Sequence, residues 1–129
     1  MTQVKNKDYT INVPVKVTYE TLYDIMFGAI CHGSTYWLHD VLDENNKGVD
    51  IETILQEGFI SRFYYPLDDN DEEFDFKAFT VSMLIKGVEM YCSQFGDCIE
   101  DGEVDSCSLG SVECDLILQY ALFGEQVYG

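Results

Sequence analysis

Basic residues are scarce in this chain. Seven Lys and Arg stand against 24 Asp and Glu, which gives a formal net charge of −17. The last basic residue is Lys86, and residues 87–129 hold nine acidic side chains with no basic one to offset them. Such a field repels nucleic acids and anionic lipids and attracts basic surfaces. The composition therefore disfavours direct binding to nucleic acid or to a membrane, and predicts a basic protein surface as the partner.

Long apolar runs are also missing. No stretch approaches the roughly 18 apolar residues that would span a bilayer, and residues 1–8 carry Lys5 and Lys7 but no apolar run of the kind found in a secretory leader. The five cysteines are an odd number without regular spacing, in a chain large enough to fold without disulfides. We expect a soluble cytosolic protein with reduced thiols.

Motifs for metal, cofactor or catalytic sites are absent from the sequence. There is no Cys-x-x-Cys pair, no P-loop, no Gly-x-Gly-x-x-Gly and no Gly-x-Ser-x-Gly. Two acidic runs alternate as calcium loops do, but their sixth position is Glu73 or Ser106 where glycine is needed, and their twelfth is Phe79 or Val112 where glutamate is needed. We therefore predict no metal, no cofactor, no catalytic residue and no enzymatic activity.

The length and hydrophobic content predict one folded domain over residues 1–129. A chain of 129 residues matches an ordinary domain, and 47% hydrophobic residues supply enough apolar surface for a core despite the charge. Strand and helix patterns alternate without repeats or linkers. The predicted fold class is α+β, with a small antiparallel sheet of about three strands packed with three to four helices.

Three segments have the pattern of strands. Residues 10–17 alternate apolar and polar positions, and Pro14 would place this strand at a sheet edge. Residues 59–65 and 73–77 are expected to pair as a hairpin across an acidic loop. Residues 34–42 fit a helix or a strand equally well over so short a run, and both alternatives stay open.

Helix signals recur four times. Thr18, Asp50 and Thr80 are N-cap residues for helices that should end near Gly33, Gly58 and Gly96, and a last helix should begin at Ser111 and end at Gly124. In that last helix the inward residues are predicted to be Leu116, Ile117, Tyr120, Ala121 and Phe123. Residues 97–110 between the third and last helices are predicted to be a polar loop.

Two acidic runs are the candidate partner-binding surface. Charge runs are more often merely solvated, but a body of this size is about 36 Å across, and duplex DNA of that length carries roughly 20 phosphate charges, close to the net charge of −17. The protein could therefore compete with nucleic acid for a groove lined by Lys and Arg, provided that the carboxylates form one continuous anionic surface. Those carboxylates are Asp68, Asp69, Asp71, Glu72, Glu73, Asp75, Asp97, Glu100, Asp101, Glu103 and Asp105.

Three stretches resemble a family of short acidic proteins from phages and integrating mobile elements of gut Firmicutes. They are DLILQYALFGEQVYG (residues 115–129), EDGEVDSC (residues 100–107) and residues 18–37 with the triplet TYW. Members of that family have Gly-Gly before the triplet, where this chain has His32-Gly33. The family carries no residue roles. The resemblance implies a mobile-element protein in the cytoplasm of a bacterial host, and by analogy an inhibitor of host defence such as CRISPR or restriction systems.

The leading hypothesis is thus a non-enzymatic nucleic-acid mimic that blocks a defence effector. One alternative is a homo-oligomeric structural or assembly protein, in which the charge only maintains solubility. Another is a small-molecule binder for a nucleotide signal, which would require a deep pocket with convergent polar groups around Tyr36, Trp37 or His39.

Overall fold

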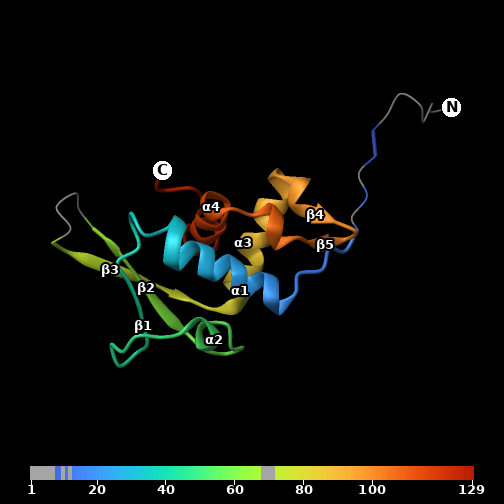
Figure 1. Ribbon diagram of the computed structural model, residues 1–129. Helices are drawn as coiled ribbons and strands as arrows, with labels where there is room; N and C mark the ends of the chain where they lie inside the picture. The colour runs from blue at the N-terminus through green and yellow to red at the C-terminus, as the bar shows by residue number, and fades with distance from the viewer. Residues whose placement is uncertain (1–7, 10, 12, 68–71) are drawn as a thin grey trace.

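The computed structural model describes residues 8, 9, 11, 13–67 and 72–129. It has the predicted α+β fold: a three-stranded antiparallel sheet, a separate two-stranded hairpin, and four α-helices. In Figure 1 helices α1, α3 and α4 lie together, the larger sheet extends from one end of them, and the small hairpin lies at the other end.

The three-stranded sheet contains β1 (Asp40–Leu42), β2 (Ser61–Pro66) and β3 (Phe74–Phe79) in the order β1-β2-β3. The predicted hairpin of the second and third strands is confirmed, with Ser61 opposite Phe79 and Pro66 opposite Phe74. One face of β2 turns Ser61 and the fully buried Phe63 to the core. The segment 34–42, left open between helix and strand, is a turn followed by β1.

Helix α1 (Tyr19–Gly28) begins at the predicted N-cap, where the Thr18 side chain accepts a hydrogen bond from the Thr21 amide. It continues as a π-helical turn (Ala29–Gly33), so the helical run ends at the predicted glycine. Helix α2 (Ile51–Ile54) is only one turn long and is capped by Asp50. Both N-cap predictions are confirmed, because Thr and Asp side chains satisfy the free amides of a first turn.

Helices α3 (Val81–Gln94) and α4 (Ser111–Phe123) form the main helical pair. Thr80 caps α3 as predicted, and Gly124 ends α4 in the left-handed conformation with φ of 73°. Gly87 allows the two helices to approach closely, since a Cβ atom there would lie 2.7 Å from the Ile117 carbonyl oxygen.

The inward face predicted for α4 is only partly right. Ile117 and Ala121 are buried, but Leu116, Tyr120 and Phe123 are half-buried. The buried face instead includes two polar side chains, Asp115 and Gln119, together with Cys114, Leu118 and Leu122. A pattern of apolar residues could not indicate that polar groups belong to the interior.

The predicted strand over residues 10–17 is wrong in its described part, residues 11 and 13–17; residues 10 and 12 lie outside the description. Only Lys16 makes a β-bridge there, parallel to Glu103. The alternation of apolar residues is real, and it orients one face of the segment toward α3. Alternation defines a face, however, and does not supply a partner strand.

The predicted polar loop over residues 97–110 is also wrong. This segment contains the hairpin of β4 (Ile99–Glu100) and β5 (Glu103–Val104), flanked by the short 3-10 turns Gly96–Cys98 and Ser106–Ser108. Strands of two residues carry too little alternation to be recognised in a sequence.

Candidate functional site

A hollow lined by six carboxylates lies between the start of α1 and the β4–β5 hairpin. Its volume is about 410 Å³. We call it the acidic hollow; its carboxylates are Glu20 and Asp24 from α1, and Glu100, Asp101, Glu103 and Asp105 from the hairpin and the residue after it. Two chain segments some 80 residues apart thus contribute one sign of charge to one concave surface, and concave surfaces focus the field of the charges that line them.

The hairpin is shaped by its two-residue turn. Asp101 and Gly102 both have positive φ, 53° and 74°. Asp-Gly at such positions is typical of the type I′ turn, whose twist matches that of paired strands. Glu100 and Glu103 flank the turn as opposite partners in the ladder. The tight turn therefore brings three carboxylates together despite their mutual repulsion.

Hydrogen bonds attach this hairpin to the rest of the protein. The Lys16 amide donates to the Gly102 carbonyl at 2.8 Å, and the Val104 amide donates to the Lys16 carbonyl at 2.9 Å. On the other side, the Ser106 hydroxyl donates to a carboxylate oxygen of Asp24 at 3.0 Å. The hollow is consequently formed by fixed elements rather than by a free loop.

Two of the six carboxylates have structural partners. Asp24 accepts from Ser106, while Asp105 accepts from the amide of Cys107 at 3.0 Å and the hydroxyl of Ser108 at 3.4 Å. The other four side chains are exposed and make no hydrogen bond within the described residues: Glu20, Glu100, Asp101 and Glu103. They are the carboxylates available to a partner.

The structure brings together only part of the predicted acidic surface. Of the late run, Glu100, Asp101, Glu103 and Asp105 line the hollow, and Asp97 is exposed outside it. Glu20 and Asp24 were missed, because isolated acids on an amphipathic helix give no signal that a distant hairpin will face them.

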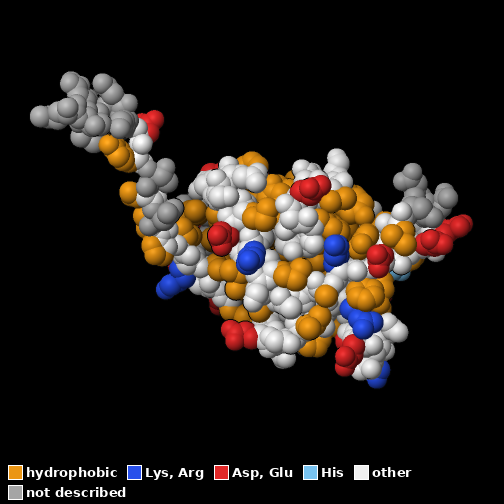
Figure 2. Space-filling model, turned by 180° about the vertical axis from the view of Figure 1, so that it is seen from behind, with side chains coloured by type: hydrophobic (Ala, Val, Ile, Leu, Met, Phe, Trp, Pro, Cys, Tyr) orange, Lys and Arg blue, Asp and Glu red, His pale blue; other side chains and the backbone are white. Residues whose placement is uncertain are grey.

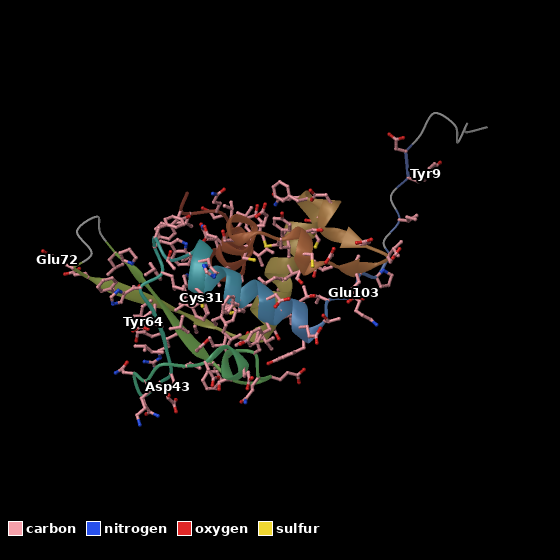
Figure 3. The ribbon with its side chains drawn as sticks, in the orientation of Figure 1. Tyr9, Cys31, Asp43, Tyr64, Glu72 and Glu103 are labelled. Carbon is pink, nitrogen blue, oxygen red and sulfur yellow. The ribbon has the colours of Figure 1, made fainter. Side chains whose placement is uncertain are left out.

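The early acidic run lies elsewhere. Glu72 lies at the tip of the β2–β3 hairpin, at the opposite end of the molecule from Glu103 (Figure 3). Glu73 and Asp75 follow it on the chain and are exposed, and Asp75 accepts from the Phe76 amide at 2.8 Å. Asp68, Asp69 and Asp71 fall outside the described residues. The described parts of the two runs therefore do not form the one continuous surface that the mimicry hypothesis required.

Polar groups around Tyr36 and Trp37 do converge, but on an internal carboxylate. Asp115 is 7% exposed and accepts from the Ser34 hydroxyl and the Trp37 indole, each at 2.7 Å, and from the Tyr36 hydroxyl at 2.8 Å. Burial and the contact with Asp115 raise the pKa of Tyr36 to about 12. The Ser34, Tyr36 and Trp37 donors are already hydrogen-bonded to Asp115, so they are not available to a small ligand.

His39, the third residue of that predicted ligand region, stacks on Phe74 with ring centroids 3.8 Å apart. Among the described residues, no group of three or more His, Cys, Asp or Glu side chains is arranged to hold a metal ion. All five cysteines are free thiols, and burial raises the pKa of Cys92 to about 12 and of Cys114 to about 11.

Comparison of the chain with protein-family models, with curated proteins and with solved structures gave no match in any of the three. No described helix is long and apolar enough to cross a membrane. Any assignment of function therefore depends on the surfaces of the protein itself.

Proposed function

We propose that this protein is a non-enzymatic binding protein that presents the acidic hollow to a Lys- and Arg-rich surface of another macromolecule. The single observation that supports this is the convergence of six carboxylates from two distant chain segments on one hollow. A solvated charge run has no need of such an arrangement.

The proposed target is the cation-lined nucleic-acid groove of a host defence effector, a class of partner taken from the resemblance to mobile-element proteins. A groove that binds DNA or RNA is lined by cations and gathers condensed anions, which an acidic protein can replace. The net charge of −17 would accelerate the encounter with a basic surface. This attraction would weaken as salt is added, because exposed charges are screened beyond about 8 Å at physiological ionic strength. Only the end of the molecule that carries the hollow would enter the groove.

The proposal is tested by two variants of equal charge. The hollow variant carries Glu20→Gln, Glu100→Gln, Asp101→Asn and Glu103→Gln, where Asn preserves the positive φ at residue 101. The control variant replaces four exposed glutamates outside the hollow: Glu44, Glu52, Glu57 and Glu125, each to Gln. Both lose four negative charges.

The assay follows a labelled duplex bound to purified CRISPR effectors and restriction endonucleases. Wild type and the control variant should displace the duplex from at least one effector at low salt and lose this activity at high salt. The hollow variant should need about fourfold more protein or above, since each of its four contacting charges contributes about 0.2 to 1 kcal/mol. The proposal would be contradicted if displacement of the duplex did not depend on salt concentration, or if both variants lost displacement activity equally.

A further inference from the structure

A second hollow lies on a different part of the surface and is lined mainly by apolar side chains. It has a volume of about 610 Å³ between the N-terminal segment and α3. Alternate residues of the segment, Ile11, Val13, Val15 and Val17, face Ile85 and Val88 of α3 across it. We call the described residues of this segment, 8, 9, 11 and 13–17, the arm. Figure 1 shows the arm leaving the body beside the β4–β5 hairpin.

The arm exposes its apolar side chains to water. Ile11 is 81% exposed and Val13 is 67% exposed. In the space-filling view of the opposite side, orange side chains follow the arm as it leaves the body (Figure 2). A row of exposed aliphatic side chains lies beside an unfilled apolar hollow. Burial of this surface against another apolar surface would be favourable, because it would remove both from water.

One backbone edge of the arm is also unpaired. The backbone amide of Lys16 donates to the Gly102 carbonyl of the small hairpin, and the Lys16 carbonyl accepts from the Val104 amide. Neighbouring residues of an extended chain direct their backbone groups to the opposite edge. The amides of Val13, Val15 and Val17 make no hydrogen bond within the described residues. Pro14 falls on the same edge as Lys16, so its missing N–H does not interrupt the free edge.

We propose that the free edge of the arm pairs with the same edge of a second copy of this chain, as an antiparallel two-fold ribbon that covers both apolar hollows. The sequence is self-complementary in one register, in which Val13 lies opposite Val15 and Ile11 opposite Val17. In that register both partners of each pair direct their amides to the shared edge, as a hydrogen-bonded antiparallel pair requires. Pro14 meets Pro14 on the two-fold axis, at a position that needs no N–H.

Charge favours the arm as the contact between two copies. Residues 1–17 hold three lysines and one aspartate, a net charge of +2, whereas the remaining residues hold four basic and 23 acidic side chains, a net charge of −19. A contact between any other parts would bring strongly like-charged surfaces together. The arm itself holds Asp8 and Lys16 and has no net charge, so a ribbon between two arms brings neutral segments together.

The first test is the mass of the intact protein in solution. Sedimentation of wild type over three decades of concentration, at about 0.15 M salt to screen the net repulsion, should show a monomer–dimer equilibrium. Val13→Asp should raise the dissociation constant on the order of 100-fold, because the two-fold arrangement counts the lost valine twice. Val112→Asp, at an α4 position that is 75% exposed, should leave the constant unchanged.

The register is tested by cross-linking in a chain whose exposed thiols are removed by Cys31→Ser and Cys107→Ser. Antiparallel residues at a non-hydrogen-bonded position have Cα atoms about 4.5 Å apart, within disulfide range. Pro14→Cys should therefore give a covalent dimer under mild oxidation, and Val112→Cys should not. A wild-type monomer at every concentration, or a dimer that persists in Val13→Asp, would overturn the inference.

Discussion

The two ends of this chain are held in opposite ways. At the C-terminal end, the side-chain oxygen of the buried Gln119 accepts from the amides of Val127 and Tyr128, at 2.8 and 2.7 Å. Tyr128 stacks on Trp37 with ring centroids 4.9 Å apart and planes 4° from parallel. At the N-terminal end, only Lys16 bonds to the body among the described residues of the arm. The C-terminal end is held by buried side chains of the protein, whereas the described part of the N-terminal arm is held by one residue and leaves its other backbone edge unpaired.

The difference shows how polar and apolar residues can exchange their usual roles. Asp115 and Gln119 are buried because each lone pair and donor finds a partner, which removes the penalty for burying them. Ile11 and Val13 are exposed because none of the described elements covers them. In this protein the buried carboxylate of Asp115 has a structural role, whereas Ile11 and Val13 form an exposed apolar surface.

Asp115→Ala should have the largest effect on the attachment of the C-terminal end. It leaves the hydroxyls of Ser34 and Tyr36 and the indole of Trp37 without their acceptor. We expect a loss of about 3 to 5 kcal/mol in the free energy of unfolding, measured with urea. Asp115→Asn keeps one acceptor oxygen and should cost less. A loss below about 1 kcal/mol in the alanine variant would show that the network does not hold this region.

Tyr128→Ala tests the stacking that fastens the tail. Removal of the ring exposes Trp37 and should cost about 1 to 2 kcal/mol, by the same unfolding measurement. Tyr128→Phe serves as the control and should be nearly neutral, because within the described part of the chain this residue forms hydrogen bonds through its backbone alone. Equal losses in the two variants would point to the hydroxyl instead of the ring.

Alkaline pH should loosen the same region. The pKa of Tyr36 is raised to about 12 from its ordinary value near 10 by burial of its hydroxyl and by Asp115. The folded state therefore holds this proton more tightly than the unfolded state, so its contribution is complete below about pH 10 and is lost as the pH rises toward 12. Unfolding free energies measured across this range should fall less steeply in Tyr36→Phe than in wild type. Identical slopes would contradict this assignment.

The smallest effect is expected at the arm. Val13→Ala should change the unfolding free energy by less than about 0.5 kcal/mol when the protein is dilute enough to be monomeric, because the side chain is already exposed. At concentrations where the dimer forms, the same substitution should lower the apparent stability through mass action. A large loss in the monomer would mean that the arm is fastened as firmly as the tail.

Local signals account for what the sequence predicted well. The caps at Thr18, Asp50 and Thr80 and the left-handed Gly124 depend on neighbours within one helical turn, and all four were found in place. The β2–β3 pairing follows from two long strand patterns close together in the chain.

Long-range choices account for what the sequence could not predict. The pairing of Lys16 with the β4–β5 hairpin joins residues more than 80 positions apart, and each strand of that hairpin has only two residues. The meeting of Asp24 with Ser106 and the convergence of donors on Asp115 span similar separations. The acidic hollow was half predicted for this reason: the late run identified its hairpin side, and nothing local identified its helical side.

We propose that the hollow, and not net charge alone, selects a basic partner. The most direct measurement is the affinity of a nona-arginine peptide for wild type, the hollow variant and the control variant, by calorimetry at low salt. The affinity should be lower by about fourfold or more in the hollow variant, and by much less in the control variant of the same net charge. Equal weakening of both variants would contradict it, because binding would then follow total charge wherever that charge lies.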